Sequence, residues 1–146
     1  MINLIVKRPY RKFINNDFLV KVATFILEYL SSPAVDLTIS ITDDQDIRKL
    51  NKQFRNVDSP TDVLSFPSNE IDPQTNRAYI GDVVISFQRA KEQALDFKHS
   101  VMKEISILTI HGILHLFQYD HESQDDARKM FLLQDEIMIK LKINNL

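Results

Sequence analysis

Short runs of β-branched and aromatic residues alternate along the chain with longer segments whose apolar residues recur every three or four positions. The short runs lie at residues 2–6, 35–41, 61–67 and 79–86, and they are typical of strands. The stretch 68–78 contains Pro, Asn and Asp, which favours a loop that joins the last two strands in a hairpin. The pattern therefore predicts about four strands and leaves their order in the sheet open.

Helical spacing predicts five further elements, at residues 15–30, 42–54, 86–99, 100–118 and 123–146. Most begin with a side chain that can cap the first turn, namely Asn15 or Asn16, Thr42 with Gln45 three residues on, Ser86 and Ser123.

The segment 100–118 differs from the other predicted helices because it is apolar almost all round, as a buried central helix would be. Its small residues Ser106, Thr109 and Gly112 would let neighbouring elements approach closely. We expect an α+β fold, in which about five helices pack on a small mixed four-stranded sheet.

Composition limits the number of domains, the compartment and the kinds of site that the chain can have. A length of 146 residues suits one domain, so we expect a single domain over 1–146, and no apolar run is long enough to cross a bilayer, which favours a cytoplasmic protein without membrane contact. The absence of cysteine excludes disulfides and thiolate metal sites. A net charge of -2 argues against coating nucleic acid by bulk charge. The basic clusters at 7–12 and 48–55 are either solvated faces with no binding role or local basic patches that could contact nucleic acid.

Three of the four histidines fall within residues 111–121. His111 and His115 are four residues apart, so on a helix they share one face and can bind the same ion. A turn after the helix could bring His121 to the same ion, and three ligands with an open position describe a catalytic zinc site. The alternative is a set of core histidines bonded to carbonyl groups. His99 lies outside the cluster and is interpreted as an ordinary exposed helix residue.

The ligand spacing also matches that of the metzincin proteases, with two departures. Gly112 stands where those enzymes have their general-base Glu, so peptide hydrolysis by that route is disfavoured. Gln118 stands where a Gly would permit a left-handed turn. That turn is therefore either strained by about 1 kcal/mol or shaped differently, and the placing of His121 depends on it.

The segments HGILHLFQYDH, LNKQFRNVDSPTDVLSFP and IGDVVIS together resemble the YbeY family of bacterial single-strand-specific endoribonucleases that act in ribosomal RNA maturation and ribosome quality control. The three segments occur in the family's order, and the resemblance covers roughly residues 35 to 140. The family's histidine segment usually has Gly where this chain has Gln118. The fold that the resemblance implies, a small mixed sheet covered by helices with the metal at one end of a groove, agrees with the pattern analysis.

The resemblance also implies residue roles. His111, His115 and His121 would hold one zinc, or another divalent transition metal, at the end of the central helix, and Arg55 would be the catalytic basic residue facing the cleft. From the residues alone, Arg55 would instead be expected in a surface ion pair. Asp120 either accepts a hydrogen bond from an imidazole N–H or starts the turn. Asp62 and Asp82 receive no chemical role.

The implied partners are ribosomal RNA and ribosomal subunits or assembly factors, and the oligomeric state is left open. Two other functions remain at this point. One is a ribosome-assembly binding factor whose metal mainly braces the fold. The other is a metallopeptidase-like hydrolase, which rests on ligand spacing only.

Overall fold

The computed structural model describes residues 1–120 and 122–146, and it confirms the α+β class and the mixed four-stranded sheet. The strands are β1 (Ile2–Val6), β2 (Val35–Thr42), β3 (Val63–Ile71) and β4 (Ala78–Ser86). The α-helices are α1 (Asn16–Tyr29), α2 (Asp44–Arg55), α3 (Phe87–Asp96), α4 (Val101–Leu116) and α5 (Gln124–Lys140). Two short 3-10 helices, η1 (Arg8–Phe13) and η2 (Ile143–Asn145), complete the elements that the described residues form.

The strand order is β1-β2-β4-β3, in which β1, β2 and β4 run parallel to one another and β3 runs antiparallel to β4. The predicted hairpin is therefore confirmed, and it places β3 at one edge of the sheet. Pro67 lies within this edge strand, a position that proline tolerates because its missing N–H faces outward or meets a bulge. The β3–β4 register shifts between Pro67 and Glu70, so the hairpin bends there.

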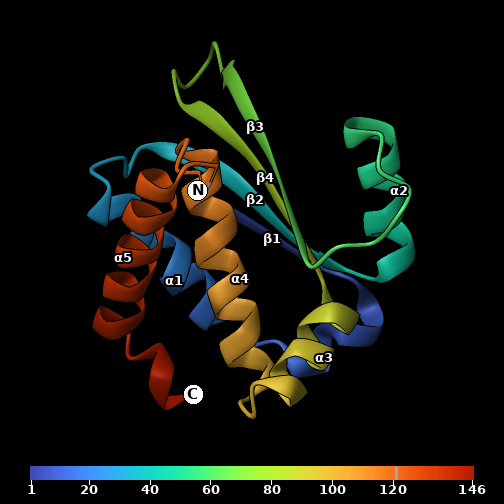
Figure 1. Cartoon of the computed structure of the whole chain (residues 1–146). Helices are drawn as coiled ribbons and strands as arrows, with labels where there is room; N and C mark the ends of the chain where they lie inside the picture. Colours follow the sequence, from blue (N-terminus) through green and yellow to red (C-terminus); the bar gives the residue numbers. More distant parts are fainter. Residues whose placement is uncertain (121) are drawn as a thin grey trace.

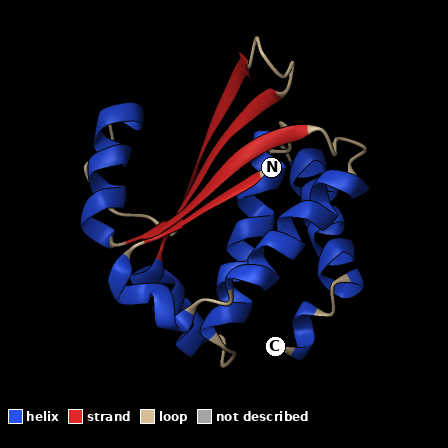
Figure 2. Cartoon of the chain, turned by 180° about the vertical axis from the view of Figure 1, so that it is seen from behind, coloured by secondary structure: helices blue, strands red, loops and turns tan. Residues whose placement is uncertain are grey.

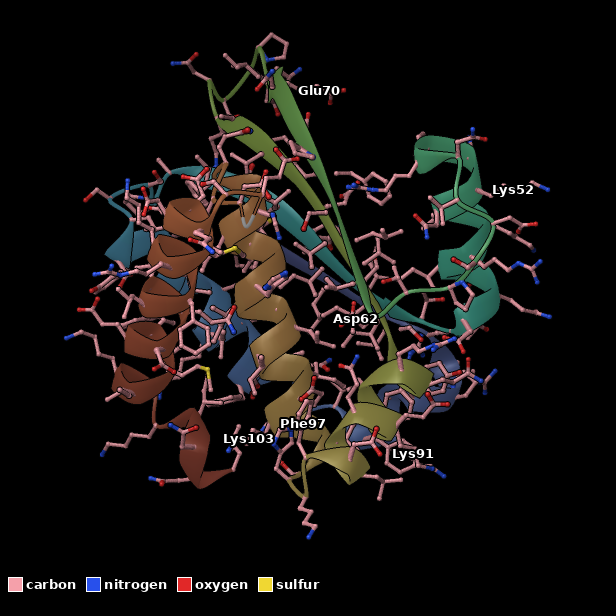
Figure 3. The ribbon with its side chains drawn as sticks, in the orientation of Figure 1. Lys52, Asp62, Glu70, Lys91, Phe97 and Lys103 are labelled. Carbon is pink, nitrogen blue, oxygen red and sulfur yellow. The ribbon has the colours of Figure 1, made fainter. Side chains whose placement is uncertain are left out.

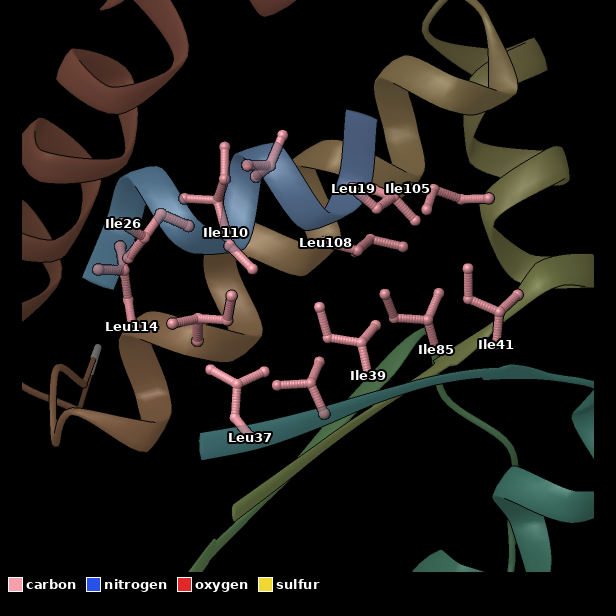
Figure 4. Close-up of a cluster of buried hydrophobic side chains, with 14 of the residues drawn as sticks. Leu19, Ile26, Leu37, Ile39, Ile41, Ile85, Ile105, Leu108, Ile110 and Leu114 are labelled. Atoms are coloured by element: carbon pink, nitrogen blue, oxygen red, sulfur yellow. The ribbon is translucent and has the colours of Figure 1, made fainter. Parts of the chain in front are cut away.

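The helices lie unequally on the two faces of the sheet. α1, α4 and α5 cover one face, while α2 stands by itself on the other side, next to β3 (Figures 1 and 2). Figure 4 shows the main core between α1, α4 and the sheet, where side chains such as Ile39, Ile85 and Ile110 are fully buried. A second, smaller cluster of Ile47, Leu64 and Val84 lies under α2. α4 thus has buried residues along most of its length, and much of the sheet face beside α2 is left open.

Several predicted boundaries need correction. The N-cap of α2 is Asp43, whose carboxylate accepts from the Asp46 N–H at 2.9 Å, and not Thr42. β3 continues to Ile71, because the strand pairs with β4 beyond its bulge, so the predicted loop is shorter than 68–78. α5 ends at Lys140 and does not continue to residue 146. The caps Asn15, Ser86 and Ser123 are confirmed.

Within residues 1–120 and 122–146, none of the helices combines the length and the hydropathy that a membrane-spanning segment needs.

Candidate functional site

A cleft of about 500 Å³ opens beside the C-terminal half of α4. Its walls come from α4, from the first half of β3 with the residues before it, from the end of α2, and from the segment that follows α4. His111, His115 and Arg55 all line it. Asp62, which also lines the cleft, lies just before β3, and Glu70 lies near the far end of the same strand (Figure 3). The structure therefore brings together three of the four predicted site residues; the fourth, His121, lies outside the described residues.

The two histidines face each other across one turn of α4. Their Nε2 atoms are 3.1 Å apart and their ring centroids 4.6 Å apart, with the ring planes inclined at 72°. On the other side of the first ring, His111 Nδ1 lies 3.3 Å from the amide oxygen of Gln134 on α5. If Nδ1–H donates to that oxygen, the Nε2 lone pair is left pointing into the cleft, which is the usual arrangement of a metal-binding imidazole.

This separation suits two ligands of one ion. Zinc–nitrogen bonds of 2.0–2.1 Å in a tetrahedral arrangement place two ligating nitrogens about 3.3 Å apart. The observed 3.1 Å between His111 and His115 is close to that value. The described residues supply two of the three predicted ligands, and within them there is no group of three or more His, Cys, Asp or Glu side chains that could hold an ion.

Gly112 explains how α4 comes to lie against the sheet at this point. A Cβ at residue 112 would collide with the Val83 side chain of β4 and would also press on Val63 of β3. The helix therefore approaches the sheet through the missing side chain. Ser65 of β3 adds a buried hydrogen bond, its hydroxyl donating to the Gly112 carbonyl at 2.8 Å. These contacts fix the distance between the histidine helix and the edge strand, and the close approach predicted at Gly112 is confirmed.

Arg55 reaches the cleft from the last residue of α2. Its guanidinium donates to the backbone carbonyl of Ser65 at 2.7 Å and lies 5.7 Å from the centroid of the Phe66 ring. Among the described residues it forms no ion pair, so the surface ion pair expected from the residues alone is not what holds it. Only one of its five N–H donors is used in this bond, which leaves others for an anionic ligand.

Gln118 adopts the left-handed conformation, with φ 71°, at the residue where the resemblance led us to expect Gly. It ends α4 in a Schellman motif, because the Gln118 N–H donates to the His115 carbonyl and the Tyr119 N–H to the Leu114 carbonyl. The turn therefore has the shape that a glycine would give it, with the steric cost that a side chain brings. Of the two alternatives that the sequence left for this turn, the strained one is observed.

The acidic residues near the cleft have different surroundings. Asp62 accepts from the Val63 N–H at 2.8 Å and from the Gln93 amide at 3.2 Å, so its carboxylate shapes the start of β3. Asp120 lines the cleft, and the choice between its two predicted roles stays open. Asp82 lies on the other face of the sheet, where its carboxylate accepts a hydrogen bond from the Tyr79 hydroxyl. The pKa of Tyr79 is raised, mainly by burial of the phenol and secondly by this hydrogen bond.

The interpretation of His99 as an exposed helix residue is wrong. It lies in the turn between α3 and α4, its side chain is 15% exposed, and its Nε2 is 2.8 Å from the buried carboxylate of Glu104. A carboxylate in the first turn of the most buried helix requires a partner, and His99 provides it.

One cation from each basic cluster is held in a surface ion pair. Lys7 bonds to Asp43 and Asp46 at 2.7 and 3.1 Å, and Arg48 bonds to Asp58 at 2.8 Å. These cations are paired at the surface, in contrast to Arg55.

The sequence analysis did not identify two residues that shape the site. Gln134 lies on α5 beside apolar residues, and a polar side chain in that position was the available signal. Ser65 lies inside a predicted strand, and nothing local marks its contact with α4.

Comparisons with known proteins point to one family. The family model described as endoribonuclease YbeY matches residues 7–142. The chain is 44% identical over 140 residues to the endoribonuclease YbeY of Persephonella marina, covering 95% of this chain and 92% of the relative. It is 45% identical over 139 residues to that of Sulfurihydrogenibium sp., covering 94% and 91%. The solution structure of a Thermotoga maritima protein matches with a TM-score of 0.62 at 29% identity, covering 99% of this chain and 93% of the other.

Proposed function

Because the chain belongs to the YbeY family of endoribonucleases, we propose that it cleaves single-stranded RNA in the maturation of ribosomal RNA and in ribosome quality control. The observation that carries the proposal is the pairing, in one cleft, of two facing histidines with an arginine. The proposed partners are ribosomal RNA and ribosomal subunits or assembly factors, and the proposed compartment is the cytoplasm.

The proposed metal ligands are His111, His115 and His121, with one zinc, or another divalent transition metal, per chain. The 3.1 Å between the first two Nε2 atoms supports this choice, as does the Gln134 oxygen behind His111, which would hold that ring in place. An ion held there would supply Lewis-acid polarisation of a phosphoryl oxygen.

The proposed role of Arg55 is to bind and orient the scissile phosphodiester. A guanidinium stays protonated and presents a planar fork to phosphate oxygens, so it stabilises the charge that builds up on them in the transition state. The bond to the Ser65 carbonyl fixes its position beside β3 without neutralising its charge. Because Ser65 also bonds to Gly112, the same strand residue holds the arginine and the histidine helix together. The geometry is compatible with attack by water or by the RNA's own ribose hydroxyl, and analysis of the product ends distinguishes them.

A peptidase is the weaker candidate. In metzincins the residue after the first histidine is the general base, whereas here a Cβ at residue 112 would collide with Val83 of β4, so there is no room for a side chain.

The test is cleavage of a single-stranded ribosomal RNA fragment and of the same sequence in a duplex. We expect the single strand to be cut, and Arg55→Ala to lower kcat/KM about a hundredfold. Arg48→Ala is the matched control, because Arg48 lies in the same helix and bonds to Asp58; it should cleave as the wild type does. Normal cleavage by Arg55→Ala would remove the proposed role of this arginine. If the wild type does not cut the single strand while loss of metal unfolds the protein, the assembly-factor function replaces the nuclease.

A further inference from the structure

Phe54 is 60% exposed although it belongs to the apolar positions of α2. Its ring lies 5.4 Å from that of Phe66 on β3, at an interplanar angle of 64°. The guanidinium of the next residue, Arg55, lies over the Phe66 ring, 5.7 Å from its centroid. Phe54 and Phe66, here called the phenylalanine shelf, therefore form an aromatic surface directly beside the cation of the cleft.

The shelf stands where two cavities meet. Phe54 and Phe66 line a second cavity of about 730 Å³ on the open sheet face beside α2, whereas Arg55 lines the cleft with the histidines. Pro67 lines both cavities. A ligand bound in the cleft at Arg55 can thus continue over the edge strand β3 and reach the shelf.

Packing within the chain accounts for the position of Phe66 but not for that of Phe54. Phe66 packs on the small cluster of Ile47, Leu64 and Val84 under α2. Phe54 lies outside that cluster, meets Phe66 at its edge and leaves most of its own surface to solvent. A large apolar ring left open beside an arginine is the arrangement by which proteins hold single-stranded nucleic acid, the ring stacking on a base and the cation binding a phosphate.

We propose that the phenylalanine shelf stacks a nucleobase of the RNA, next to the phosphate that Arg55 binds. The proposal rests on the proposed nuclease function and adds a base-binding subsite to it. The acidic residues limit where the RNA runs. Asp82 and Glu70 line the same second cavity and repel phosphate, so only the uncharged base enters at the rim while the backbone stays on the Arg55 side. Lys52 of α2 points outward from the helix, away from the sheet, and does not contribute to this path (Figure 3).

The shelf also accounts for a preference for single strands. In a duplex the bases are paired and stacked on their neighbours, so none can leave the stack to meet Phe54 without unpairing. An unpaired base has no such barrier. Removing the shelf should therefore weaken the binding of single strands and leave the duplex unaffected.

The chain contains no tryptophan, which permits a direct optical test. Phe54→Trp introduces a single indole at the shelf, and a stacked base quenches its fluorescence. The matched control is Phe131→Trp on α5, at a residue that is 63% exposed and lies on the opposite side of the sheet from α2. Stopped-flow mixing with a single-stranded oligoribonucleotide should quench the first variant at concentrations near KM and leave the second unchanged.

Steady-state kinetics supply the second readout. Phe54→Leu should raise KM for the single strand about tenfold, in the range of base–aromatic stacking, with kcat and the melting temperature little changed. Phe54→Tyr should restore KM, and Phe131→Leu should not alter it. Absence of quenching, with KM within twofold of an active wild type, overturns the shelf and leaves the nuclease standing. Quenching by a basic peptide but not by RNA assigns the shelf to a protein partner and also overturns the proposal. A wild type that neither binds nor cuts single-stranded RNA removes the proposed function itself.

Discussion

The contact at Gly112 gives a sharp quantitative prediction about how the histidine helix is held. Gly112→Ala would add a methyl group that collides with one γ-methyl of Val83 and lies 3.2 and 3.3 Å from the other and from Val63. Overpacking of this kind typically lowers the free energy of unfolding by 1–3 kcal/mol, and we expect about 3 kcal/mol for so close a collision. Alanine gains about 1 kcal/mol over glycine in a helix. The net expectation is a loss of about 2 kcal/mol.

The effect of Gly112→Ala on stability should change sign when the Val83 side chain is shortened. In a Val83→Ala background the new methyl group enters the space that the valine vacates, so only the helix preference remains and Gly112→Ala should stabilise by about 1 kcal/mol. The coupling energy between the two sites is then about 3 kcal/mol, at the upper end for residues in contact. Urea denaturation of the wild type, the two single variants and the double variant measures it. Equal effects of Gly112→Ala in both backgrounds would show that Val83 does not set the position of α4.

Three further predictions concern the turn after α4, a surface ion pair and the cleft cation. Gln118→Gly should raise the melting temperature by about 2–4 °C in a thermal scan, because glycine adopts the left-handed conformation without steric cost. Hydrogen bonds from Arg77, then from the N-terminal ammonium group, lower the pKa of Asp36. This ion pair therefore stabilises the fold above about pH 4 and is lost as the pH falls through the lowered pKa, so urea titrations at pH 6 and 3 should show a smaller loss of stability for Asp36→Asn than for the wild type. Arg55→Lys keeps the charge but not the planar fork, and kcat/KM for RNA should fall about tenfold.

Each of these has an outcome that contradicts it. A lower melting temperature for Gln118→Gly would mean that the glutamine side chain stabilises the turn. The same dependence of stability on pH in Asp36→Asn and wild type would remove this ion pair from the acid response. Full activity of Arg55→Lys would show that charge alone is needed.

Most helices and strands could be predicted from sequence because their capping residues and hydrophobic periodicity lie within the segment itself. Ser86 and Ser123 cap helices that begin at the next residue, and the alternation in 35–41 gives β2. The strand order depends on pairing between segments far apart in sequence, such as Ile2 with Leu37, and no local pattern encodes it. The extension of β3 to Ile71 has the same origin, since it exists only through pairing with β4.

The residues of the candidate site likewise differ in whether local sequence predicts their placement. The i, i+4 spacing of His111 and His115 predicts their facing arrangement, which the structure confirms. Arg55 could be assigned to the cleft only through the family resemblance, because a cationic residue on a charged helix is ordinarily solvated. Phe54 follows the apolar spacing of α2, yet the helix stands at the edge of the sheet and leaves this ring uncovered. Periodicity shows which side of a helix is apolar but not whether anything covers it.

The most direct test of the account is the metal content of untagged protein, measured by mass spectrometry together with cleavage of a single-stranded ribosomal RNA fragment, for the wild type and for His115→Ala. We expect about one zinc, or one other divalent transition metal, per wild-type chain, and the loss of both metal and cleavage in the variant. A wild type without bound metal, or a variant that cleaves as well as the wild type, would contradict the claim that these histidines form the metal centre of a ribonuclease.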